Sequence, residues 1–270
     1  MAPTIKLSFP ETRAFWELSV LFEDGHLLAL DKPTGLLSLP DHDHPERPSL
    51  LGLLHAGIAQ GKSWARERGL THLTLVNRLE TEVGGIVLFA KSKPVQVQLS
   101  NLFGAEKPLL RYLCLVSGAP PEDQFEVNAP LAPDLRQVGE TKVDTRHGKK
   151  SRTLFSVLER FSRWTLLKCE PLTARPHQIQ AHLRYVKLPI AGDAFYGGRP
   201  LLLSRLKPAY RLKPGRQEQA LLGRTALHAA GLTFNHPVTG EPLNIESPQP
   251  KDLTVALKYL RQYASPQASL

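Results

Sequence analysis

The chain has 270 residues, 41% of them hydrophobic, and basic residues outnumber acidic ones to give a net charge of +9. This length fits one large domain or two modest ones, with enough apolar residues for a sizeable core. No apolar run is long enough to cross a bilayer, and the first residues lack a signal pattern and include acids that a transit peptide avoids. These features argue against a membrane-spanning protein and predict a cytoplasmic one. The positive charge favours a polyanionic partner, with nucleic acid first and an anionic membrane surface second.

Strands outnumber helices along the chain, and their connections are too irregular for repeated strand–helix–strand units. This pattern predicts an α+β fold with a mixed, mostly antiparallel sheet and flanking helices in a single domain, residues 1–270. In chain order we expect strand 26–30, a helix capped by Ser49, strands 73–76 and 86–90, a helix after Pro94, strands 111–117, 153–158 and 164–169, a helix opened by Pro176, strands 227–234 and 243–246, and a helix over 251–263.

Three residue-level expectations accompany these elements. The helix after Pro94 is expected to bury Val97, Leu99, Leu102 and Phe103. The two cysteines, Cys114 and Cys169, lie in apolar strand-like runs. They are expected to pack in the core and to form neither a disulfide framework nor a metal site.

The most informative stretch is Asn77-Arg78-Leu79-Glu80, which is followed by Val83-Gly84-Gly85 and an apolar strand. It places a carboxylate and a guanidinium beside a tight turn, where glycines let another backbone or a ligand approach closely. Taken alone, Glu80 is typical of an ordinary turn acid. An ionised carboxylate at a cleft can also attack a sugar carbon, as in retaining glycosidases.

Two further segments have a structural and a functional interpretation. Tyr112, at the start of its strand, is either a core aromatic residue or a ring that stacks on an extruded base and moves a proton. Arg175 precedes a helix start, where side chain and backbone amides can face an anion together, although a lone arginine more often forms a surface ion pair. His177 and His182 are five residues apart and do not share a helix face, which argues against a metal pair.

The stretch 198–224 is strongly basic. It is either a solvated loop or a phosphate-contacting surface on which Tyr196 and Tyr210 offer rings for stacking. The stretch contains a single acid, Glu218. Its basic residues are Arg199, Arg205, Lys207, Arg211, Lys213, Arg216 and Arg224.

Metal and nucleotide cofactors are not expected. The loop Asp41-His42-Asp43-His44 superficially resembles a ligand cluster, but the sequence offers no matching ligand group elsewhere. There is also no phosphate-cradling glycine loop and no serine nucleophile elbow.

In order and spacing, the motifs resemble the RluA-type pseudouridine synthase family from about residue 18 to residue 250. The matching pieces are Asp31-Lys32-Pro33-Thr34-Gly35, Arg78-Leu79 with Gly85, Arg111-Tyr112-Leu113, Arg175 with His177-Gln178-Ile179 and His182, Gly192-Asp193 with Tyr196-Gly197, Leu227-His228-Ala229, and His236-Pro237-Val238-Thr239-Gly240.

The resemblance implies a pseudouridine synthase fold with a central RNA-binding cleft, into which a uridine of ribosomal or transfer RNA is flipped and isomerised without cofactor or metal. It assigns the nucleophilic carboxylate to Glu80, the base-stacking tyrosine to Tyr112 and the basic partner of the carboxylate to Arg175. Arg78 matches the arginine that supports flipping. The expected substrate-binding residues are Arg78, Asn77, His177, Gln178, Arg205, Lys207 and Arg211.

The chain departs from the family pattern around the site. Glu80 stands where the family has aspartate, Asn77 stands where it has histidine, and Val83-Gly84 replaces a threonine–serine pair. In the third motif, Ala174 and Pro176 replace glycine and threonine, and Gln180 replaces arginine.

Two hypotheses follow from the match and the departures. The first is an RNA pseudouridine synthase, expected as a monomer, in which Glu80 acts in the aspartate's place. The second is a catalytically silenced RNA-binding protein on the same fold. The resemblance also implies that the small N-terminal RNA-binding domain of many relatives is missing, so that target choice rests on the catalytic domain.

Overall fold

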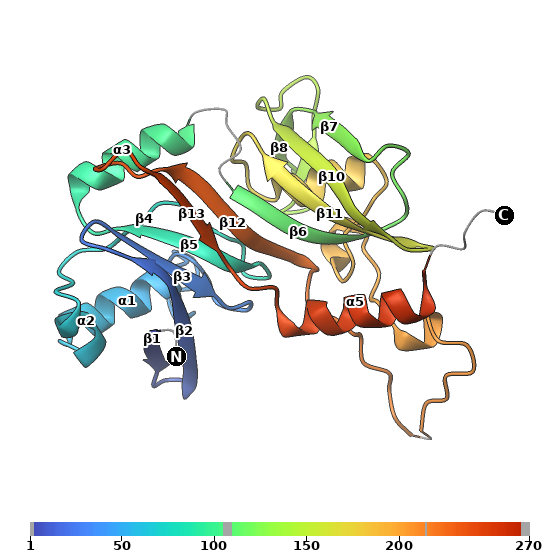
Figure 1. Cartoon of the computed structure of the whole chain (residues 1–270), viewed down its shortest axis with the longest axis horizontal. Helices are drawn as coiled ribbons and strands as arrows, with labels where there is room; N and C mark the ends of the chain where they lie inside the picture. Colours follow the sequence, from blue (N-terminus) through green and yellow to red (C-terminus); the bar gives the residue numbers. More distant parts are fainter. Residues whose placement is uncertain (1–2, 105–109, 214, 266–270) are drawn as a thin grey trace. The chain divides into compact units, whose positions relative to one another are not determined.

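The computed structural model describes residues 3–104, 110–213 and 215–265 (Figure 1). The chain divides into two compact units. Unit 1 consists of Met1–Leu110 and Ala229–Ser247, and unit 2 of Arg111–His228 and Pro248–Leu270. Within the described residues, no helix is both long enough and apolar enough to cross a membrane.

Unit 1 is built on an antiparallel sheet. Its first four main strands pair in the order β1 (Thr4–Phe9), β2 (Ala14–Glu23), β3 (Leu27–Lys32) and β5 (Gly84–Ala90). The short β4 (Thr74–Leu75) also pairs with β5, and the unit 1 part of β12 (Leu227–Asn235) forms a hairpin with β13 (Pro242–Glu246).

Every residue of β5 is buried. This explains its continuous run of apolar residues, because a strand covered on both faces has no polar side to alternate with. The core around it is formed by β3, β5, α3 (Lys93–Gly104), β12 and β13.

The described residues of unit 1 form three helices: α1 (Leu50–Ala59), α2 (Ser63–Glu67) and α3. Ser49 caps α1 as predicted, because its Oγ accepts a hydrogen bond from the backbone N–H of Gly52 at 3.2 Å. The expectation for α3 was partly wrong. Val97 is 50% exposed, and Val95 packs into the core in its place beside Leu99.

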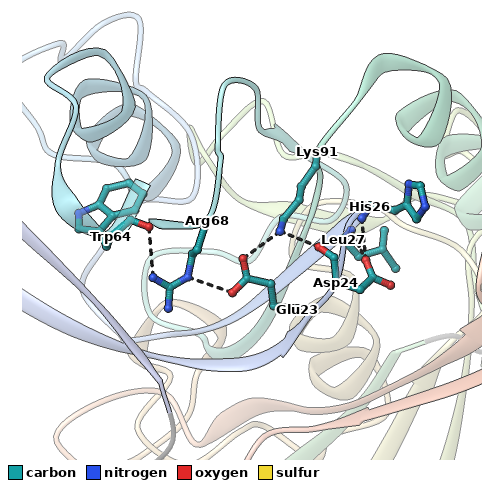
Figure 2. Close-up of polar contacts among 7 residues, drawn as sticks. All are labelled: Glu23, Asp24, His26, Leu27, Trp64, Arg68 and Lys91. Carbon is teal, nitrogen blue, oxygen red and sulfur yellow. Dashed lines mark hydrogen bonds and ion pairs between the residues drawn. The ribbon is translucent and has the colours of Figure 1, made fainter. Parts of the chain in front are cut away.

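A polar cluster fastens the β2–β3 turn to neighbouring elements (Figure 2). The carboxylate of Glu23 pairs with the guanidinium of Arg68 at 2.9 Å and with the ammonium of Lys91 at 2.8 Å. Lys91 also donates to the backbone carbonyl of Asp24 at 2.6 Å, and the carboxylate of Asp24 accepts from the backbone N–H groups of His26 and Leu27. Both cations of this cluster are therefore used in joining elements within unit 1.

Unit 2 contains a second antiparallel set of strands, paired in the order β6 (Leu110–Ser117), β11 (Trp164–Pro171), β10 (Arg152–Arg160) and β7 (Gln124–Asn128). A separate hairpin joins β8 (Leu131–Pro133) to β9 (Thr141–Val143). The helices are α4 (Gln178–Tyr185), α5 (Lys251–Tyr263) and two 3₁₀ turns, η1 (Ala194–Tyr196) and η2 (Leu203–Arg205).

Cys114 and Cys169 are free and fully buried on β6 and β11, as the packing prediction required. Burial raises the pKa of the Cys114 thiol well above its ordinary value, and the neighbouring Cys169 and Asp193 add to the rise. A buried thiol of raised pKa behaves as a small hydrophobic group.

The predicted fold class is confirmed, since the molecule combines a large, mostly antiparallel sheet with few helices. The prediction omitted the β1–β2 hairpin, the short strands β7, β8 and β9, and the five-residue helix α2. The single-domain assignment and the central cleft remain predictions.

Candidate active site

Glu80 is half-buried in the loop between β4 and β5 of unit 1, three residues after Asn77 and next to Leu79. The buried hydroxyl of Ser38 holds this loop from one side. It donates to the carbonyl of Leu79 at 2.6 Å and accepts from the N–H of the same residue at 3.0 Å. The N–H of Val83 closes the following turn onto the carbonyl of Glu80 at 3.1 Å.

The side chain of Asn77 anchors the other side of the loop. Its amide nitrogen donates to the carbonyl of Ile86 at 3.0 Å, and its amide oxygen accepts from the N–H of Leu88 at 2.8 Å. These two hydrogen bonds extend the β4–β5 hydrogen-bond ladder further along β5. Asn77 is 7% exposed, so the structure places this predicted substrate-binding residue in the support of the loop.

Both glycines after the loop are enclosed by backbone. A Cβ on Gly84 would lie 3.1 Å from the carbonyl oxygen of Lys32, and one on Gly85 only 2.2 Å from that of Ala229. Gly85 also has a φ of +114°, a backbone angle that residues with a side chain rarely adopt. The close approach expected at these glycines is made by the protein's own chain, which fixes where the loop meets β5.

Lys32 is the functional candidate that the sequence analysis missed. Its side chain is 1% exposed, and its ammonium donates to the carbonyls of Pro33 at 3.0 Å and Leu36 at 2.7 Å. Burial lowers the pKa of Lys32 from 10.5 to about 8, and the nearby charges of Glu80 and Glu82 oppose that shift without cancelling it. The only sequence signal was its place in the Asp31–Gly35 motif.

Arg78, in the same loop, is exposed. Unit 1 therefore presents Arg78 and Glu80 on one short loop. Hydrogen bonds from Asn77 and Ser38 anchor this loop, and so does the bond from the N–H of Gly35 to the carbonyl of Thr81 at 2.7 Å. A carboxylate held in this way can act as a nucleophile or stabilise a sugar cation.

Tyr112 lies on β6 of unit 2 and is 8% exposed. In the antiparallel ladder it is opposite Cys169, near the end of β11. The chain leaves β11 at Pro171 and reaches Arg175 a few residues later. The register therefore brings Tyr112 and the loop carrying Arg175 to the same end of the sheet.

The buried amide of Gln178 organises this loop. Its oxygen accepts from the hydroxyl of Thr173 at 2.8 Å and from the N–H of Arg175 at 3.2 Å. Its nitrogen donates to the carbonyl of Arg152 and to the hydroxyl of Thr153, both at 2.9 Å. All four hydrogen-bonding positions of the amide are filled, so Gln178 ties the Arg175 loop to β10.

His182 extends this network into the core. It is fully buried, and its Nε2 donates to the carbonyl of Ala129 at 2.9 Å while its Nδ1 accepts from the hydroxyl of Thr153 at the same distance. Burial lowers the pKa of His182, although the bond to Ala129 opposes the shift. A neutral ring with its proton on Nε2 fits both contacts.

Arg175 itself is partly exposed. Its Nε and Nη2 both donate to the carbonyl of Lys150 at 3.3 Å. His177 adopts a left-handed φ of 51° at the start of α4, and its ring lies 6.3 Å from the ring of Phe195 and 5.7 Å from that of Tyr196.

The predicted basic surface is partly corrected. Arg205, Lys207 and Arg211 are exposed, as an RNA-contacting segment requires. Tyr196 is not available for stacking on a base, because it is 1% exposed and its hydroxyl accepts the N–H of Thr141 at 2.9 Å. Tyr210, within the segment, is partly exposed. Tyr263 of α5 is a further ring beside the segment, since its centroid lies 5.9 Å from the ammonium of Lys207.

The Asp41–His44 loop forms only local contacts in the structure. Asp41 pairs with Arg47 at 3.2 Å, and His44 with Glu46 at 3.3 Å. Over residues 3–104, 110–213 and 215–265, no group of three or more histidine, cysteine, aspartate or glutamate residues is arranged to hold a metal ion.

Comparison with known proteins supplies the family. A family model described as RNA pseudouridylate synthase matches residues 26–185. An uncharacterized RNA pseudouridine synthase of Bacillus subtilis is 30% identical over 247 residues, which cover 91% of this chain and 74% of the relative. The ribosomal large subunit pseudouridine synthase C of Salmonella typhi is 34% identical over 246 residues, covering 91% of this chain and 70% of the relative.

The fold agrees with this result. The structure of the human RNA pseudouridylate synthase domain containing protein 4 matches with a TM-score of 0.66 at 21% identity, over 90% of this chain and 92% of that chain. At this identity the likeness shows the fold alone. The family model and the sequence relatives together confirm the RluA-type resemblance, and the chain belongs to the RNA pseudouridylate synthase family.

Proposed function

We propose that this protein is an RNA pseudouridine synthase that converts uridine to pseudouridine in ribosomal or transfer RNA, with Glu80 as the reacting carboxylate. The observation that carries the proposal is the loop of Glu80. Asn77 and Ser38 anchor it by two hydrogen bonds each, and two enclosed glycines follow it. Family membership supplies the reaction, and the names of the relatives favour RNA of the large ribosomal subunit.

The reaction is an isomerisation, so its atoms balance without a co-reactant. The bond from C1′ of the ribose to N1 of uracil breaks, the base rotates, and a new bond forms from C1′ to C5. The C5 proton then leaves to solvent, and N1 takes up a proton in its place. An ionised carboxylate can trap or stabilise the cationic sugar, or take a proton from it. We assign this role to Glu80.

Lys32 supports this carboxylate from inside the protein. Below a pH of about 8 its buried ammonium is charged and interacts electrostatically with Glu80 and Glu82. Because its protons are partly engaged by the carbonyls of Pro33 and Leu36, Lys32 is a positioning residue rather than one that contacts RNA.

Unit 2 carries the other residues that match the family's motifs. We assign base stacking and proton transfer to Tyr112, and contact with the negative charge of the RNA to Arg175. Gln178 positions the Arg175 loop through its four hydrogen bonds. His177 lies at the start of α4, and we assign it to contact with the substrate.

RNA binding completes the proposal. The exposed Arg78 is assigned to flipping the target nucleotide, and the exposed Arg205, Lys207 and Arg211 to contacts with RNA phosphates. We further propose that the enzyme acts as a cytoplasmic monomer and uses neither a metal nor a nucleotide cofactor.

The test is release of tritium from RNA labelled at C5 of uracil, with RNA affinity measured in parallel. Glu80→Gln removes the charge at nearly constant volume, so turnover should disappear while the dissociation constant for RNA stays near that of the wild type. Unchanged turnover in this variant would remove Glu80 from the chemistry. Loss of affinity together with turnover would assign Glu80 to binding or folding.

A further inference from the structure

Helix α5 carries a pair of aromatic rings on its outer side. Tyr259 and Tyr263 are one helical turn apart, and their ring planes are within 13° of parallel with centroids 6.3 Å apart. Both rings are partly exposed. The packed side of the helix is formed by other residues, since Leu253, Ala256, Leu257 and Leu260 are buried. The tyrosine pair is therefore not required to fill the core.

The basic segment around η2 passes α5 (the orange loop in Figure 1), and its Lys207 lies next to Tyr263. The ammonium of Lys207 lies 5.9 Å from the centroid of the Tyr263 ring, within the range of a cation–π contact. The segment exposes a surplus of cations: Arg199, Arg205, Lys207, Arg211, Lys213 and Arg216. Its one acid, Glu218, already accepts the backbone N–H of Ser204 at 2.8 Å.

Charge and ring geometry together favour one kind of partner. Exposed cations bind the phosphates of any nucleic acid, whereas exposed aromatic faces add affinity only where bases are unpaired and can stack. An acidic protein surface would satisfy the cations but would leave the rings without a comparable contact. A duplex would offer phosphates and would keep its bases stacked on one another.

We propose that Tyr259 and Tyr263, with Lys207 and the neighbouring cations, form a docking platform for a single-stranded stretch of the substrate RNA. The rings stack on its bases, and Lys207 reaches a phosphate of a stacked nucleotide. The platform gives the proposed pseudouridine synthase a second hold on its RNA, and the inference rests on that function. It is separate from the residues assigned to the reaction.

The experiment measures binding of two fluorescently labelled oligonucleotides of equal length and charge, an oligouridine and its abasic counterpart, by anisotropy. Tyr263→Leu should weaken oligouridine binding about tenfold, because stacking is lost, and should leave binding of the abasic strand unchanged. Tyr263→Phe keeps the ring and should match the wild type. Tyr259→Leu should reproduce the effect from the preceding turn of the helix, and a circular dichroism melt verifies that each variant is folded.

Two outcomes would overturn the platform: unchanged oligouridine affinity in both leucine variants, or an equal loss of affinity on the abasic strand. The binding assay requires no turnover, so its result holds whether or not the wild type releases tritium. Failure of the platform with intact tritium release would leave the proposed function standing. Base-dependent binding without tritium release would support the platform and would contradict the proposed function.

Discussion

Lys32 shows how a single buried charge can set the behaviour of the candidate nucleophile. An ammonium that is 1% exposed pays a large desolvation cost, which its two carbonyl contacts only partly offset. The negative charges of Glu80 and Glu82 supply further compensation.

We expect turnover to fall on an alkaline limb as the pH passes about 8, where Lys32 loses its proton. The measurement is the initial rate of tritium release at saturating RNA from neutral to alkaline pH. Lys32→Met should be slower on the order of tenfold and should lack this limb, since it has no proton to lose. A limb at the same pH in Lys32→Met would assign the titration to another group.

The lowered pKa of Lys32 also makes the free energy of unfolding depend on pH. The folded pKa of about 8 lies below the unfolded value of 10.5, so between these values the unfolded chain binds more protons than the folded one. The free energy of unfolding of the wild type should therefore rise with pH across this window, relative to Lys32→Met.

At the scale of elements, hydrogen-bonded side chains take the place of regular pairing where the candidate residues lie. Asn77 extends the β4–β5 ladder toward Glu80. Gln178, Thr153 and His182 form a chain that joins α4 to β10 below Arg175. A loop fixed in this way keeps its reacting group in place, and displacements of about 1 Å can cost on the order of a hundredfold in rate.

Gln178→Glu tests this arrangement with a change of nearly equal volume. The carboxylate cannot donate to the carbonyl of Arg152 or the hydroxyl of Thr153. We expect a loss of about 2 kcal/mol in the free energy of unfolding, because a buried network is broken. Turnover should fall more than the loss of folded protein explains, with denaturant melts and single-turnover rates as the readouts.

The control is Gln98→Glu, the same substitution at an exposed position of α3. It should leave both the melt and the rate unchanged. Equal stability of Gln178→Glu and Gln98→Glu would show that the network does not hold the loop.

At the scale of the whole molecule, the net charge of +9 is concentrated in part on one segment of unit 2. Neutralising Arg205, Lys207 and Arg211 together should weaken RNA binding and reduce the slope of log affinity against log salt by about two, since each contributes about 0.7 on a single strand. Titrations of anisotropy at several salt concentrations measure the slope. Neutralising the exposed Lys6, Lys62 and Arg66 of unit 1 removes the same charge and should change it much less.

Some features of the fold and the candidate site could be predicted from the sequence, and others could not. The amphipathic period of residues 251–263 predicted α5 with its observed ends, because its buried face repeats every three to four residues. Strands β7 to β9 were missed because they are short and partly polar, and Val97 was misplaced because α3 is apolar on more than one side. Motif spacing proposed Glu80, Tyr112 and Arg175 as site residues, whereas the burial of Lys32 and Tyr196 depends on contacts between distant segments that no local pattern records.

The most direct test of the central claim, that Glu80 works in the place of the family's aspartate, is tritium release by the wild type beside Glu80→Asp. The account predicts release by the wild-type protein from RNA labelled at C5 of uracil. Silence from the wild type together with release by Glu80→Asp would contradict it, and would mean a silenced site on an intact scaffold.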